Sequence, residues 1–218
     1  MARLLKLIKV GCQHCPPTFS AQPKVKMRPH RTEFKPVMEL SGPWEVCFDR
    51  EWFYSGDVGE ALGNDSGPIE VGFDQLEDWS RRPEAAVKYY SGSAIYRKSF
   101  ILKELKSSDS GIMLDLGNVE VIARVKLNGR DLGVLWTKPF RVDATDAVKA
   151  GENELEVDVA NLWPNRLTGD TFLPREKRRT RTNMTKYTQS SELLPSGLLG
   201  PVRFMEESCT EESLNLNN

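Results

Sequence analysis

Side chains suited to holding a polyhydroxylated ligand cluster in the segment NLWPNRLTGD, residues 161–170. An indole offers a flat apolar face that covers the C–H face of a pyranose ring. Amide, guanidinium and carboxylate groups bond pairs of hydroxyls with directional geometry. The segment is too polar for a core, which predicts a surface loop facing a carbohydrate. The candidate sugar-binding residues are Asn161, Trp163, Asn165, Arg166 and Asp170.

A second interpretation of this segment stays open. Trp163 would then pack over the edge of the fold, and Arg166 and Asp170 would form a local ion pair. Trp136 is a further candidate for sugar contact at the rim of the fold, with packing beneath the neighbouring hairpin as its alternative. Trp44 is expected in the core.

The sequence predicts no catalytic residue. Glycoside hydrolysis needs two carboxyl groups about 5 Å or about 6.5–9.5 Å apart, and no acid here forms a distinctive local motif. Glu152 and Glu154 are expected to be solvated charges at the edge of a strand. His14 and His30, the only histidines, lie in the N-terminal segment, which excludes a Ser-His-Asp or Cys-His centre in the folded part. Catalysis by this chain alone is therefore not expected.

Metal and cofactor signals are also weak. Cys12 and Cys15 form a single C-x-x-C without a second pair, so no zinc site is predicted. The chain has no P-loop or dinucleotide-binding fingerprint, so no cofactor is expected.

The charge pattern limits the partners. A formal net charge of −1 gives no global field that would recruit nucleic acid or an anionic membrane. The basic run REKRRTR, residues 175–181, lacks the interleaved aromatics of a nucleic-acid module. It is expected to be solvated or to face a partner, with phosphate or an acidic polysaccharide as alternative ligands. Neither nucleic acid nor a membrane is an expected partner.

The N-terminus carries no recognisable signal peptide. Lys6 and Lys9 interrupt its apolar run, and no stretch approaches the roughly 18 apolar residues of a spanning helix. The chain as given is therefore expected to be cytoplasmic.

Short strands must position the candidate side chains. Apolar residues alternate in WEVCF (44–48), in SAIYRKSFIL (93–102), and in ELEVDVA (154–160). Val121, Ala123, Val125 and Leu127 are expected on one face of another strand, before an Asn128-Gly129 pair that predicts a tight hairpin. Strands every 8 to 12 residues or so, with no long amphipathic helix, predict an all-β antiparallel sandwich.

Composition divides the chain into three parts. Residues 1–36 are expected to be a disordered leader or linker, residues 37–206 the β-sandwich, and residues 207–218 a disordered tail.

The middle of the chain resembles a known family. VIARVKLNGRDLGVLWTKPFRVDATDAVKAGENELEVDVAN (121–161) resembles the sugar-binding, galactose-binding-like jelly roll of family 2 glycoside hydrolases, and SGPWEV resembles its opening strand. The series FDQLEDWS, VKYYSGSAIYRKSF and NLWPNRLTGD is most similar to the β-sandwich of family 106 α-L-rhamnosidases. The resemblance covers about residues 40 to 205, and it implies an antiparallel jelly-roll β-sandwich.

The resemblance also implies a non-catalytic, carbohydrate-binding accessory role. In such enzymes the catalytic acid and base lie in a separate barrel domain, so the expected partners are a carbohydrate and a catalytic barrel. The chain is expected to be a detached or truncated piece of a larger rhamnosidase- or β-galactosidase-like enzyme; the related full-length enzymes are often exported. A protein-interaction or structural module that keeps the fold without sugar binding is the alternative.

The resemblance gives roles to two residues. In family 2 β-galactosidases the region after the corresponding strand reaches the active site of the barrel, where an acidic residue helps to hold the sugar and a cation. By position, Asn161 and Asp170 would take such parts here. A structural Ca²⁺ is compatible with the fold, although the sequence identifies no ligands for it.

Overall fold

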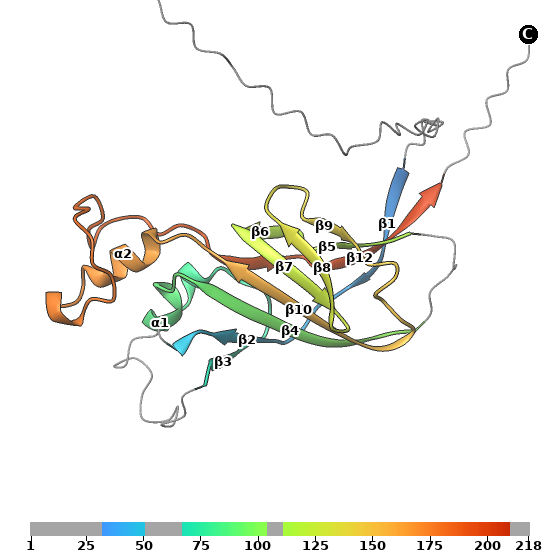
Figure 1. Cartoon of the computed structure of the whole chain (residues 1–218), viewed down its shortest axis with the longest axis horizontal. Helices are drawn as coiled ribbons and strands as arrows, with labels where there is room; N and C mark the ends of the chain where they lie inside the picture. The colour runs from blue at the N-terminus through green and yellow to red at the C-terminus, as the bar shows by residue number, and fades with distance from the viewer. Residues whose placement is uncertain (1–31, 51–66, 104–110, 210–218) are drawn as a thin grey trace, which may run out of the picture.

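The protein is an antiparallel β-sandwich. The computed structural model describes residues 32–50, 67–103 and 111–209 (Figure 1). One sheet has the strand order β1 (Thr32–Glu39), β12 (Arg203–Cys209), β5 (Ile112–Asp115) and β9 (Arg141–Asp143). The other has the order β3 (Ile69–Phe73), β2 (Trp44–Phe48), β4 (Ser93–Leu102), β10 (Gly151–Ala160), β7 (Ile122–Leu127) and β8 (Arg130–Leu135). A two-stranded ribbon pairs β11 (Gly197–Gly200) with β6 (Asn118–Glu120).

The described helices are short. They are η3 (Trp79–Arg81), α1 (Ala85–Lys88), α2 (Pro164–Asp170) and η4 (Arg175–Lys177). None of the helices in the described ranges is long and apolar enough to cross a membrane.

The predicted faces of β10 and the predicted hairpin are confirmed. The inward residues of β10, Leu155, Val157 and Val159, are fully buried. Asn128 and Gly129 have φ angles of 52° and 79° and join β7 to β8, as a type I′ turn requires. The all-β sandwich follows from these short alternating strands.

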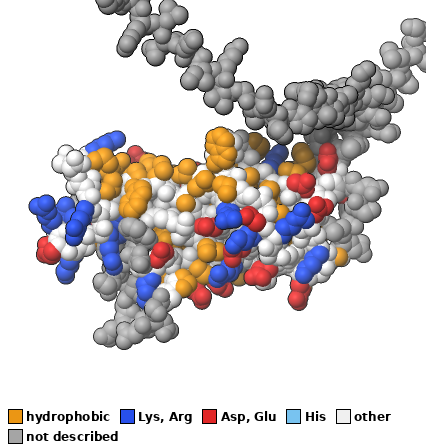
Figure 2. Space-filling view, viewed as in Figure 1, with side chains coloured by type: hydrophobic (Ala, Val, Ile, Leu, Met, Phe, Trp, Pro, Cys, Tyr) orange, Lys and Arg blue, Asp and Glu red, His pale blue; other side chains and the backbone are white. Residues whose placement is uncertain are grey.

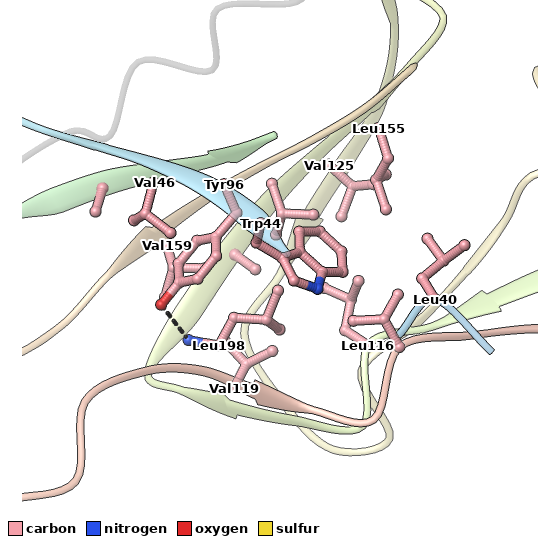
Figure 3. Packing of buried hydrophobic residues seen from close by; sticks show 14 of the residues in the cluster. Leu40, Trp44, Val46, Tyr96, Leu116, Val119, Val125, Leu155, Val159 and Leu198 are labelled. Carbon is pink, nitrogen blue, oxygen red and sulfur yellow. Dashed lines mark hydrogen bonds between the residues drawn. The ribbon is translucent and has the colours of Figure 1, made fainter. Parts of the chain in front are cut away.

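The core lies between the sheets, where Figure 3 shows its side chains interleaving. Trp44 is 2% exposed, as predicted, and packs edge-on against Tyr96. The buried Tyr96 hydroxyl accepts a hydrogen bond from the backbone N–H of Leu198 at 3.0 Å, which ties β11 to the large sheet. Burying aromatic side chains of this size is worth roughly 25 cal/mol per Å² of apolar surface, so the core supplies a rigid base.

Two strand expectations are corrected. β1 begins at Thr32, inside the range assigned to the leader, and β12 runs to Cys209, inside the range assigned to the tail, because these two strands pair with each other. Val121, expected to face inward with Ala123, is 39% exposed. It lies in the break between β6 and β7, where the alternation restarts at Ile122.

The fold is elongated and its ends differ. α2 and the chain that follows it lie at one end of the long axis, and the outer ends of β1 and β12 lie at the other (Figure 1).

Candidate functional site

The segment NLWPNRLTGD is not a surface loop. Residues Pro164–Asp170 form α2, with Trp163 as its N-cap residue. Proline suits the first helical turn because the N–H that it lacks would have no helical partner there. Asn165, Arg166, Thr168, Gly169 and Asp170 are buried, so the expectation that this stretch is too polar for the interior is wrong.

Asn165 is held by the chain itself. Its side-chain amide donates to the carbonyl of Leu194 at 2.7 Å and to Ser196 Oγ at 3.1 Å, and its Oδ1 accepts from the Leu194 N–H at 2.8 Å. Burying a side-chain amide destabilises the fold unless such hydrogen-bond partners are present. Asn165 therefore fixes α2 to the chain that leads into β11.

Asn161 makes a second polar anchor. Its Oδ1 accepts from the N–H of Gly92 at 3.0 Å, and its Nδ2 donates to the carbonyl of Tyr90 and to Ser196 Oγ, both at 2.9 Å. The side chain joins the end of β10 to the loop before β4 and to the segment before β11.

Asp170 and Arg166 also point into the fold. Asp170, 3% exposed, accepts from the N–H of Thr180 at 2.7 Å and from that of Arg179 at 3.3 Å, and the Thr180 hydroxyl donates to the same carboxylate. Arg166 is fully buried, and its backbone N–H donates to Ser91 Oγ at 3.2 Å. Both residues organise the backbone around α2.

The two candidate tryptophans are exposed. Trp163 is 49% exposed at the start of α2, and Trp136 is 73% exposed just after β8. Trp136 therefore does not pack beneath the hairpin. Of the six candidate residues, these two present an indole to solvent.

The chain after α2 forms an arm, defined here as residues 171–190, at the α2 end of the molecule (Figure 1). The arm and the end of α2 surround an open hollow of about 1410 Å³. Asp170 lines this hollow and fixes the arm at Thr180.

Comparison with known families decides what kind of domain this is. The sequence profile of the family described as "Glycosyl hydrolase 2 galactose-binding domain-like" matches residues 76–190. The chain belongs to this family.

Two relatives of this galactose-binding-like domain place it in longer proteins. A Formosa agariphila protein named "Putative beta-glucuronidase" is 40% identical over 193 residues, which cover 78% of this chain and 15% of that protein. The structure of a rhamnosidase from Novosphingobium sp. PP1Y has a TM-score of 0.71 and 34% identity, covering 86% of this chain and 16% of the rhamnosidase. The predicted resemblance to family 2 and rhamnosidase sandwiches is confirmed, and the chain spans about a sixth of the length of these relatives.

The anchors of the galactose-binding-like domain include two serines that the sequence did not reveal. Ser196 bonds both Asn161 and Asn165, and Ser91 Oγ donates to the carbonyl of Leu162 at 2.9 Å. Their partners lie 31 to 75 residues away along the chain. No local pattern marks them, because only the folded chain brings them to α2.

Cys47 lies beside carboxylates on the outer face of the domain. Among the described residues, Glu45, Cys47 and Glu70 have potential metal-ligand atoms within 4.8 Å of one another. An Arg97 nitrogen already lies 3.1 Å from Cys47 Sγ and 3.6 Å from a Glu45 oxygen. Burial raises the pKa of the Cys47 thiol, whereas metal binding needs the thiolate. We assign no metal to this group, and Cys12 and Cys15 lie outside the described residues.

Proposed function

We propose that this chain is the carbohydrate-facing, non-catalytic sandwich of a glycoside hydrolase. The observation that carries the proposal is the contrast at α2, where Trp163 is half exposed and its polar neighbours bond inward. Trp163 supplies the stacking surface for a sugar ring. Asn161, Asn165, Arg166 and Asp170 hold that indole in place instead of contacting the sugar.

A catalytic domain is the natural partner of such a sandwich. Relatives named for glucuronidase and rhamnosidase activity extend far beyond the matched region. Within the described residues, the carboxylates of Glu45 and Glu70 come close together, but they lie exposed on the outer sheet face. Glu45 is ion-paired with Arg97 at 3.6 Å. A glycosidase pair needs one carboxyl group kept protonated by its surroundings, so the proposed catalytic groups belong to the partner domain, a barrel in related enzymes.

Sugar titration with two matched variants tests the role of Trp163. Calorimetry with rhamnose- and galactose-containing oligosaccharides should give weak binding that Trp163→Ala reduces by about tenfold, the loss expected when a stacking aromatic is removed. Trp136→Ala is the control, because it removes another exposed indole, which follows β8 instead of opening α2. Equal binding by wild type and Trp163→Ala would refute the assignment.

A protein-interaction module is the second candidate. Val121, Ile122, Val134 and Trp136 are all exposed near the β7–β8 hairpin, and exposed apolar groups of this kind mark docking surfaces. Two results together would favour this candidate. The wild type would bind no sugar but would bind a separately expressed catalytic domain, and Val134→Glu would weaken that binding.

A further inference from the structure

The arm carries three arginines, Arg175, Arg178 and Arg181, that have no carboxylate within ion-pair distance among the described residues. All three line the hollow of the arm. Seven arginines elsewhere in the described ranges lie within ion-pair distance of carboxylates, and these are Arg81, Arg82, Arg97, Arg124, Arg130, Arg141 and Arg203. Arg50 instead donates to the carbonyl of Gly67 at 2.7 Å.

Figure 2 shows the same contrast on the visible face. Lys and Arg side chains gather at the α2 end, whereas positive and negative side chains alternate across the middle of the molecule. The lining contains two carboxylates, Glu176 and Asp170. The Asp170 carboxylate accepts hydrogen bonds from the N–H groups of Thr180 and Arg179, so its role is to hold the backbone of the arm.

Hydroxyl and amide side chains make up most of the remaining lining. They include Asn183, Thr185, Thr188 and Gln189, with Tyr187 beside them. Such groups bond sugar hydroxyls. The hollow, at about 1410 Å³, exceeds the roughly 300–1,000 Å³ of sites for drug-sized ligands, so it has room for more than one sugar ring.

We propose that the hollow of the arm binds an acidic oligosaccharide, whose rings carry carboxylate or sulfate groups. The guanidinium fork matches such anions with two parallel hydrogen bonds, and the hydroxyl and amide groups accommodate the neutral part of each ring. This inference rests on the proposed function, since it names the class of glycan that the sandwich faces. A sugar is favoured over an acidic peptide because its many hydroxyl groups both donate and accept hydrogen bonds, as the hydroxyl and amide side chains of the lining do.

A matched pair of trisaccharides tests the proposal. Trigalacturonic acid and α-1,4-linked galactotriose differ only in the carboxylates, so calorimetry at low ionic strength isolates the contribution of the anionic groups. The full-length chain should bind trigalacturonic acid, or a sulfated galactotriose, at least about tenfold more tightly than galactotriose, and raised salt should remove that preference. Which acidic probe binds identifies the anionic group.

Two double variants locate the effect. Arg178→Gln with Arg181→Gln should abolish the preference for the acidic sugar, while Arg124→Gln with Arg130→Gln, on paired arginines of the sheet, should keep it. Circular dichroism and urea denaturation check that each variant is folded. Because Trp163→Ala reports on the neutral sugar, the two proposals fail separately.

Three results would overturn the inference. Equal affinity for acidic and neutral trisaccharides, with Trp163→Ala still weakening both, removes the acidic preference but leaves the proposed function intact. If Arg178→Gln with Arg181→Gln keeps the preference for the acidic trisaccharide, the anionic groups bind outside the hollow of the arm. Hexaglutamate or a short oligonucleotide binding as tightly as trigalacturonic acid shows a general polyanion surface instead of a sugar site.

Discussion

The outer face of the large sheet and the arm are both rich in cations, yet they differ in how those cations are used. On the sheet, Glu45, Arg97, Glu156 and Lys126 lie in a row across β2, β4, β10 and β7. Arg97 lies 3.6 Å from both glutamates, and Lys126 lies 2.9 Å from Glu156. The charges of the row compensate one another, whereas Arg175, Arg178 and Arg181 of the arm line an open hollow.

Strand register explains the difference. Antiparallel pairing places residues of neighbouring strands directly opposite each other, so the register alone brings opposite charges into contact. The arm has no partner strand, and its backbone is fixed through Asp170 and Thr180 instead. The number of basic residues therefore says little about anion binding until their partners are known.

Removing the anchor of the arm should have the largest effect. Asp170→Ala leaves the N–H groups of Thr180 and Arg179 without their acceptor, and we expect the free energy of unfolding to fall by about 2 kcal/mol. Urea denaturation measures the loss, and trypsin should cut the arm faster. Glu176→Ala, which removes an exposed acid of the arm, is the control and should change neither result. Unchanged cleavage in Asp170→Ala would show that the carboxylate does not organise the arm.

Stripping the acids from the sheet row should make the two regions alike. Glu45→Gln with Glu156→Gln frees Arg97 and Lys126, at a cost of about 1 kcal/mol in unfolding free energy because the pairs are partly exposed. The variant should gain affinity for trigalacturonic acid. Glu152→Gln with Glu154→Gln removes two exposed acids outside the row and makes the matched control. If the first variant gains no more affinity than the control, ion pairing is not what prevents the sheet face from binding the acidic sugar.

The pH dependence of stability on this face should depend on two carboxyl groups whose pKa values are shifted in opposite directions. Hydrogen bonding to Lys126 lowers the pKa of Glu156, so its stabilisation is present above its unfolded pKa and is lost as pH falls through the folded pKa. Burial, and then the nearby Glu156 charge, raises the pKa of Asp158 despite a hydrogen bond from Ser93. Its contribution is greatest below the unfolded pKa and is lost as pH rises through the folded value.

Asp158→Asn should therefore stabilise the protein at pH 7. The expected gain is about 0.5 kcal/mol, kept small because the group is only partly buried and solvent screens its charge. Urea denaturation at pH 7 and again below the ordinary aspartate pKa of 3.8 measures the gain, and the advantage should disappear at the lower pH. An advantage that persists there would mean that charge is not its cause.

The smallest stability effect should come from the arm arginines. Arg175→Gln has no ion pair to lose, so the free energy of unfolding should change by less than about 0.5 kcal/mol. Arg141→Gln, which loses a 2.7 Å contact with Asp115, should lower it by more. Thermal denaturation of both variants checks the order, and a larger loss in Arg175→Gln would place that side chain in the folding energetics of the arm.

The strands and the hairpin were predictable because their signals are local. Alternating apolar residues predicted β2, β7 and β10, and Asn128-Gly129 predicted the turn between β7 and β8. β1 escaped prediction because its pairing with β12 spans nearly the whole chain. Its exposed residues include Lys35 and Pro36, so it lacks a clear apolar face.

The candidate site was predicted in its composition but not in its orientation. Polar residues near a tryptophan indicate sugar recognition only if they face solvent, and periodicity carries no information about where a polar side chain finds its partners. Asn165 and Asp170 turn inward because Ser196 and Thr180, distant in the sequence, meet them there. The seven-residue helix α2 escaped because so short a helix shows no clear amphipathic period.

The pairing of Thr32 with Cys209 has an architectural consequence. The chain enters and leaves the fold through adjacent strands, and domains with neighbouring entry and exit points tolerate insertion into other polypeptides. Flanking sequence of any length can therefore be joined at that pole of the molecule without crossing the sandwich. The opposite pole, with α2 and the arm, stays free of that junction.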